Sequence, residues 1–101
     1  PLYYRDASAA ILVYDITEMA SFQSLSYWIK ELDEKVKKDN MVLVLAGNKC
    51  DMNEKRQVFQ DQAEKMAKEN NMLFFEVSAM RGDGVPEMFK AMAERISKLG
   101  Q

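Results

Sequence analysis

Three stretches of the chain, which begin at residues 9, 41 and 72, are apolar at nearly every position. They do not alternate apolar with polar residues, as a strand with one solvent-exposed face would. Continuous runs of this length, rich in β-branched and aromatic residues, are typical of strands covered on both faces. We therefore predict buried strands over residues 9–15, 41–47 and 72–77.

The segments after these runs carry recurring, mostly apolar residues at helical spacing. The three stripes consist of Phe22, Leu25, Ile29, Leu32 and Val36, then Ala63, Met66, Ala67 and Asn70, then Val85, Met88, Phe89, Met92, Ile96 and Leu99. The last stripe has a marked start, because Pro86 suits a first helical turn and Glu87 suits the positive end of the helix dipole. We predict helices over residues 20–37, 60–70 and 85–99.

The order strand–helix thus occurs three times, with runs that start roughly 30 residues apart, the size of a βαβ unit. A solenoid repeat of similar period is the alternative, but the three units share no repeated signature. We predict one α/β domain over residues 1–101, a three-layer parallel sheet with right-handed helix crossovers.

Composition and charge narrow the range of functions that this domain could have. Of the 101 residues 48% are hydrophobic and 30% charged, with a net charge of −2, as in an ordinary soluble domain. A near-neutral balance argues against a nucleic acid partner, which needs a clustered positive face. The single cysteine, Cys50, cannot form an internal disulfide, and this favours a reducing compartment. The absence of histidine removes the commonest general base and metal ligand, and we assign no catalytic residue and no metal site.

The polar residues that follow the predicted strands are the candidates for binding. In open parallel sheets ligands bind beyond the carboxyl ends of the strands, here residues 15–17, 47–51 and 78–82. The second and third of these segments follow consecutive parallel strands, so both should open on the same rim of the sheet. For Asp15, in the first segment, we expect only local hydrogen bonding.

The segment Asn48-Lys49-Cys50-Asp51 has a chemical interpretation. A carboxylate at Asp51 offers two acceptor oxygens, which match two neighbouring N–H donors on a planar ligand; guanine has such an edge and adenine does not. The stem of Lys49 can lie over an aromatic ring while its ammonium stays in water. Asn48 carries a donor and acceptors, so it can tie adjacent loops together. The competing interpretation is a polar turn after a strand.

These motifs, in this order, resemble the Rab branch of the small Ras-like GTPases. Asn48–Asp51 is similar to the guanine-specificity motif NKxD of that family, and Glu76–Met80 is similar to its second guanine loop, E-x-S-A-K. Tyr3–Ala7 and Leu12–Thr17 resemble the Rab segments YYRGA and LVYDIT, in the form typical of early-endosomal Rabs. The resemblance covers essentially the whole chain and implies the C-terminal half of a P-loop NTPase G domain.

The resemblance assigns roles within the first motif. It implies that Asp51 accepts hydrogen bonds from N1–H and the 2-amino group of guanine, and that Lys49 packs along the base and the ribose. Asn48 would brace the phosphate loop. The ligand implied is a guanine nucleotide, GTP or GDP.

The second motif would complete the base site. Ser78 would steady the loop, and the amide of Ala79 would donate to the guanine carbonyl. Met80 replaces the usual lysine, so that side-chain stacking there would come from a thioether, while the backbone role is kept. Asp6 replaces the glycine of YYRGA, which changes a position of family-specific partner contacts.

The chain lacks other parts of a complete G domain. No G-x-x-x-x-G-K-[ST] phosphate loop occurs, and the chain has only four glycines. The catalytic glutamine, the switch threonine and the Mg²⁺ ligands of the family would precede Pro1. We therefore expect a base-recognition half that hydrolyses no GTP alone and meets Mg²⁺ only through the missing N-terminal half.

The expected function is the guanine-nucleotide-binding portion of a Rab-like switch in vesicular membrane traffic. The expected partners are the missing N-terminal half or a swapped copy of the chain, which would cover the open edge of strand 9–15, together with Rab effectors and exchange factors. The expected location is the cytoplasm, with the parent protein reversibly attached to the cytosolic face of endomembranes. The alternative is a truncated α/β interaction module that binds no nucleotide, and a flavodoxin-like domain ranks below both.

Overall fold

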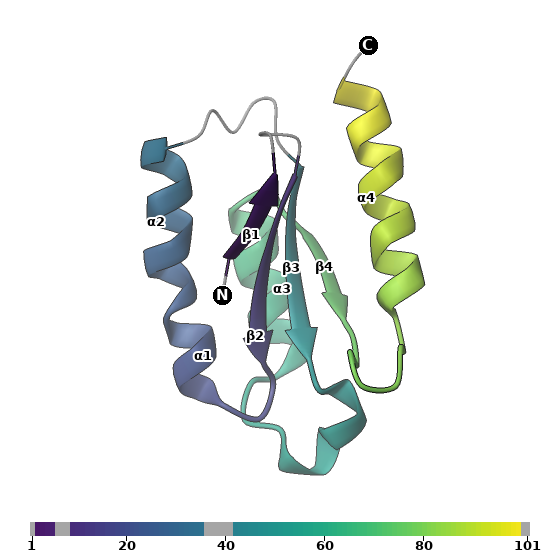
Figure 1. Cartoon of the computed structure of the whole chain (residues 1–101). Coiled ribbons are helices and arrows are strands. Elements are labelled where there is room, and N and C mark those ends of the chain that lie inside the picture. The colour runs from purple at the N-terminus through teal and green to yellow at the C-terminus, as the bar shows by residue number, and fades with distance from the viewer. Residues whose placement is uncertain (1, 6–8, 36–41, 100–101) are drawn as a thin grey trace.

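A four-stranded sheet forms the centre of the computed structural model, which describes residues 2–5, 9–35 and 42–99 (Figure 1). The strands are β1 (Leu2–Arg5), β2 (Ala9–Asp15), β3 (Val42–Asn48) and β4 (Leu73–Glu76), and they lie in the order β1-β2-β3-β4. The pairs β2–β3 and β3–β4 are parallel, so the three predicted strands and their direction are confirmed.

The strand β1 was not predicted, and it makes the sheet mixed. It pairs antiparallel with β2, from Leu2 opposite Leu12 to Arg5 opposite Ala9. Only residues 6–8 separate the two strands, too few for a crossover, so the antiparallel arrangement is the one the connection permits. The expectation of an open edge along residues 9–15 is therefore wrong for residues 9–12.

The helices are α1 (Met19–Gln23), α2 (Leu25–Lys35), α3 (Gln60–Glu69) and α4 (Val85–Leu99), with a short 3₁₀ helix, η2 (Cys50–Lys55), that was not predicted. The helix predicted over 20–37 is interrupted at Ser24. Serine hydroxyls compete for backbone groups there, since Ser21 Oγ donates to the Glu18 carbonyl and Ser24 Oγ to the Ser21 carbonyl. Val36, at the end of that predicted helix, lies outside the described residues, as does Asp6.

The two faces of the sheet are covered by different helices (Figure 1). One face packs against α1, α2 and α3 in a core that contains Ala10, Leu12, Tyr14, Ile16, Phe22, Leu25, Leu32, Leu43, Leu45, Val58, Ala63, Ala67 and Met72. The other face packs against α4, in a core formed by Val42, Val44, Ala46, Val77, Met88 and Met92. No helix within the described ranges is long and apolar enough to cross a membrane.

Burial along the strands differs from the prediction in β2 and in β4, whose residues Leu73–Glu76 are all only partly buried. Residues 42–47 of β3 are all buried, as predicted for a strand covered on both faces. In β2 the burial alternates, and Ala9, Ile11 and Val13 are only partly buried. These three side chains face the same side as α4, which packs over β3 and β4 and leaves β2 partly open.

Candidate functional site

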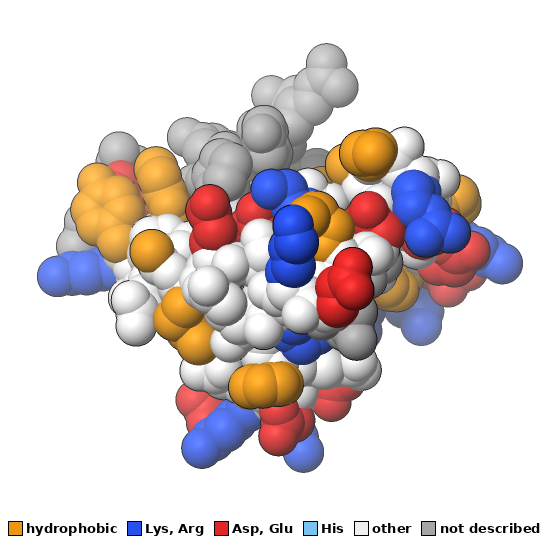
Figure 2. All heavy atoms as spheres, turned by 90° about the horizontal axis from the view of Figure 1, so that it is seen from below, with side chains coloured by type: hydrophobic (Ala, Val, Ile, Leu, Met, Phe, Trp, Pro, Cys, Tyr) orange, Lys and Arg blue, Asp and Glu red, His pale blue; other side chains and the backbone are white. Residues whose placement is uncertain are grey.

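The carboxyl ends of the three parallel strands meet at one end of the molecule (Figure 1). Asp15 lies beside Asn48 in the sheet register, and Gly47 lies beside Glu76. Two loops start there: we call residues 48–55 the first loop and residues 78–84 the second loop. Viewed onto this end, acidic and basic side chains are interspersed, and neither sign predominates (Figure 2).

A side chain of the first loop ties it to the second. Asn48 Oδ1 accepts a hydrogen bond of 2.9 Å from the backbone N–H of Ala79. The carbonyl of Asn48 accepts from the N–H of Ile16 at 3.1 Å, which fixes this residue to the segment after β2. The tie between loops that the sequence indicated for Asn48 is thus present. The N–H of Ala79, which the family resemblance assigns to a guanine carbonyl, is the donor in this tie.

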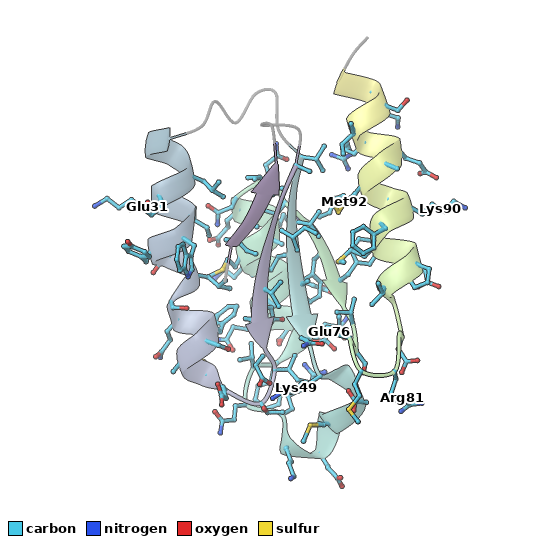
Figure 3. The ribbon with its side chains drawn as sticks, viewed as in Figure 1. Glu31, Lys49, Glu76, Arg81, Lys90 and Met92 are labelled. Atoms are coloured by element: carbon cyan, nitrogen blue, oxygen red, sulfur yellow. The ribbon has the colours of Figure 1, made fainter. Side chains whose placement is uncertain are left out.

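Lys49 lies in an ion pair that was not predicted. Its backbone is left-handed, with φ of 67°, and its Nζ lies 2.7 Å from Asp15 Oδ2 (Figure 3). The other oxygen of Asp15 accepts from the N–H of Thr17 at 2.8 Å and from its hydroxyl at 2.6 Å. Asp15 therefore makes the expected local bonds and, in addition, holds a residue of the candidate site.

These contacts shift both pKa values in the pair. Partial burial would raise the pKa of Asp15, but the hydrogen bonds from Lys49 and Thr17 outweigh it and hold that pKa below its ordinary value. The hydrogen bond to the Asp15 carboxylate and its negative charge raise the pKa of Lys49. Both side chains are thus held in their charged forms at neutral pH.

Asp51 lies half-buried in η2, two residues beyond Lys49. The turn that carries it is closed by a hydrogen bond of 2.8 Å from the N–H of Met52 to the carbonyl of Lys49. Its carboxylate makes no hydrogen bond or ion pair with another described residue, so both oxygens remain available as acceptors. The side chain of Cys50 lies outside the described part of the chain.

The second loop is held from within. Ser78 is completely buried, and its Oγ accepts from the N–H of Arg81 at 3.1 Å. Its N–H donates to the carbonyl of Asp83 at 2.9 Å, and its carbonyl accepts from the N–H of Gly82 at 2.7 Å. These bonds are what a loop-steadying role for Ser78 requires. Met80 is 88% exposed, so its thioether is presented to solvent.

A second ion pair joins the bases of the two loops. Arg56 Nη1 and Nη2 each lie 2.6 Å from an oxygen of Glu76, and Nη1 also donates to the carbonyl of Val58 at 2.8 Å. The side chains are only 12% and 14% exposed. Glu76 belongs to the second motif, but no pattern in the sequence pointed to Arg56, which lies 20 positions earlier.

Tyr14 lies beneath this end of the sheet with its hydroxyl unpaired among the described residues. Burial first and then the charge of Glu76 raise its pKa, while the charge of Arg56 opposes them, so the hydroxyl stays protonated. A Cβ at Gly47 would lie 2.6 Å from this hydroxyl oxygen, so position 47 must be glycine for the ring to fit.

The model of the Ras family matches residues 1–98 of the chain. The chain belongs to the Ras family. GTP-binding protein ypt5 of Schizosaccharomyces pombe is 46% identical over 97 residues, which are 95% of this chain and 46% of that protein. Ras-related protein RABF2a of Arabidopsis thaliana is 42% identical over 99 residues, 98% of this chain and 49% of that protein.

A third relative, Ras-related protein Rab5 of Nicotiana tabacum, is 43% identical over 98 residues, 97% of this chain and 48% of that protein. The identification of a Rab-like member of the family, made on the motifs at 3–17, 48–51 and 76–80, is thereby confirmed. The chain spans about half the length of these relatives.

Proposed function

We propose that this chain is the guanine-nucleotide-binding portion of a Rab-like small GTPase, a GTP/GDP switch in vesicular membrane traffic. The observation that carries the proposal is the hydrogen bond of 2.9 Å between Asn48 Oδ1 and the N–H of Ala79. It brings together two motifs that lie 31 positions apart in the sequence and that are both needed to read a guanine base.

The donors and acceptors on this rim fit a guanine. Asp51 presents a carboxylate with both oxygens available, which suits the adjacent N1–H and 2-amino donors of the base. The stem of Lys49 would lie along the base, and its 47% exposed side chain is accessible for that role. The N–H of Ala79 would donate to the guanine carbonyl. Its present hydrogen bond to Asn48 would then be broken or shared with the base. Met80 contributes its backbone, and Ser78 supports the loop.

In this proposal the chain binds the guanine base, and the rest of the G domain binds the phosphates and carries out the phosphate chemistry. Phosphoryl transfer depends on a phosphate loop, a metal ion and a positioned water, and the sequence holds no phosphate-loop motif. Among the described residues no group of three or more acidic or cysteine side chains could hold a metal ion. In this proposal Mg²⁺ is bound through the N-terminal half of the G domain. We therefore propose that residues 1–101 alone do not hydrolyse GTP.

The partly open face of β2 supports a partner for this domain. Ala9, Ile11 and Val13 are only partly buried there, and residues 13–15 have no strand beside them on the β1 side within the described chain. We propose that the N-terminal half of the G domain, or a swapped second copy of the chain, covers this surface. Effectors and exchange factors, a cytoplasmic location and reversible attachment to the cytosolic face of endomembranes belong to the parent protein in this proposal.

A titration with fluorescently labelled GDP tests the function. We expect weak, saturable binding to the chain, competed by unlabelled GDP but not by ADP, and much tighter binding when the N-terminal half is supplied, because phosphate contacts are then added. If ADP competes as well as GDP, the site does not read the guanine base and the proposal fails. If no nucleotide binds with or without the N-terminal half, the alternative of an interaction module that binds no nucleotide replaces the proposal.

A further inference from the structure

The ion pair between Arg56 and Glu76 lies at the junction of the two loops and outside the residues that would touch a base. We propose that it is a positioning pair, which sets the distance between the first and second loops and so holds the N–H of Ala79 against Asn48. The expected effect of the pair on affinity for a guanine nucleotide rests on the proposed function.

On one side the pair is attached to the far end of the first loop, which is itself anchored to the segment after β2. The near end is fixed at Asn48, whose carbonyl accepts from the N–H of Ile16. The far end is fixed by the N–H groups of Gln57 and Val58, which donate to the carbonyl of Ile16 at 2.7 and 3.0 Å. Arg56 directly precedes this anchor, so its guanidinium projects from a segment that is itself held.

On the other side the pair fixes the start of the second loop. Glu76 is the last residue of β4 and lies beside Gly47, and the N–H of Val77 donates to the Gly47 carbonyl at 2.8 Å. Ser78 and Ala79 follow directly. Figure 3 places Glu76 at the end of the sheet, whereas Arg81 of the second loop points outward, away from the sheet.

The chemistry of the pair suits positioning. A planar guanidinium that meets a carboxylate through two parallel bonds restricts angle as well as distance, and a lysine cannot reproduce this. Both side chains are mostly withdrawn from water, and the third bond to the Val58 carbonyl restricts the guanidinium further. A base held between two loops is sensitive to small displacements of either, because hydrogen bonds weaken steeply with misalignment.

The bond between Ala79 and Asn48 provides a direct readout without any nucleotide. Ala79 is solvent-exposed, so its amide should exchange rapidly with water unless this bond protects it. We would measure amide hydrogen exchange by NMR on the 101-residue chain and on Arg56→Lys. The expected result is exchange at Ala79 faster by about tenfold or more, and by a larger factor than at the amides of Val44 and Leu45 in β3, whose exchange reports global unfolding.

Two further variants separate positioning from general stability. Arg81→Lys makes the same change in a pair with Asp83 that is 62% and 50% exposed, and it should leave Ala79 exchange unchanged. The double variant Arg56→Met/Glu76→Met removes both charges, so it should recover global stability while Ala79 stays unprotected. Unchanged protection of Ala79 in Arg56→Lys, or restored protection in the double variant, would overturn the proposal.

A GDP titration of the same variants tests the consequence. If the wild-type chain binds GDP, Arg56→Lys should bind it more weakly, because the two loops are no longer held at the separation that a base needs, whereas Arg81→Lys should bind it as the wild type does. Equal affinity in wild type and Arg56→Lys would overturn the link to binding. If the wild-type chain binds no GDP, the proposed function fails for this chain, and the exchange data alone still decide whether the pair positions the loops.

Discussion

The two ion pairs at this end of the sheet differ in burial and in geometry. Lys49 meets Asp15 through a single contact, and its side chain is 47% exposed, whereas that of Asp15 is 17% exposed. Arg56 meets Glu76 through two bonds, and both side chains are less than 15% exposed. A single contact from an exposed lysine can open at little cost to make room for a ligand, whereas a buried bidentate pair resists opening.

This difference suggests that the two ion pairs have different roles within the site. Lys49 belongs to the motif that would contact the base, and its partner Asp15 holds it while no ligand is bound. Arg56 and Glu76 would not touch the base, and they keep the two loops at a constant separation. A site of this kind combines a movable contact with a rigid frame.

The largest effect is expected from breaking the rigid pair on one side. Arg56→Met leaves the carboxylate of Glu76 buried without its partner, which should lower the free energy of unfolding by about 3–5 kcal/mol. Urea denaturation of the wild type and the variant measures this. The double variant with Glu76→Met should recover most of the loss, and an equal loss in both would show that packing rather than the unpaired charge is responsible.

A smaller effect is expected at Tyr14, beneath the same pair. Its hydroxyl is buried without a partner among the described residues, and both oxygens of Glu76 are already occupied by Arg56. Tyr14→Phe should therefore leave the free energy of unfolding unchanged or raise it by up to about 1 kcal/mol. A clear loss of stability by urea denaturation would show that the hydroxyl has a partner.

The smallest effect on stability is expected at the pair of Lys49 and Asp15, where it should depend on pH. The pKa of Asp15 is lowered in the folded chain, so the unfolded chain binds more protons, and the contribution of Asp15 is present above its unfolded pKa and lost as pH falls below about 4. The pKa of Lys49 is raised in the folded chain, so stability changes with pH in the opposite direction. The contribution of Lys49 to stability is present at lower pH and is lost as pH rises beyond about 10.

Thermal unfolding of wild type and Asp15→Asn across pH checks this prediction. The difference in Tm between the two proteins should be small near neutral pH and should shrink further below pH 4. A difference that stays constant down to strongly acidic pH would contradict the assigned ion pair.

Much of the fold was readable because the parallel strands coincide with continuous apolar runs, and their direction followed from the strand–helix order repeated at roughly 30-residue spacing. The strand β1 could not be predicted in this way, because Leu2–Arg5 shows no alternation of apolar and polar residues. It pairs with β2 only because a short connection brings the two strands side by side. Likewise, the break at Ser24 depends on local serine bonds that a stripe of apolar residues does not reveal.

The candidate site was predictable where a motif lies within a few consecutive residues, as at Asn48–Asp51. The bond between Asn48 and Ala79 agrees with that prediction because the ends of consecutive parallel strands must meet. The partners Asp15 and Arg56 were not predicted as site residues, because ion pairs between distant charged residues leave no periodic signal. Charged side chains are common, and only the fold decides which of them meet.

The central claim is that Asp51 reads a guanine base, and Asp51→Asn tests it most directly. The change replaces one acceptor oxygen with a donor nitrogen, which would face an N–H of guanine but would match the carbonyl that xanthine carries in place of the 2-amino group. In the full-length protein we expect Asp51→Asn to bind GDP more weakly by at least about tenfold and to gain relative affinity for xanthosine diphosphate, whereas Asp51→Ala should lose GDP without that gain. If both variants keep the wild-type preference for GDP over xanthosine diphosphate, Asp51 does not read the base and the proposed site is wrong.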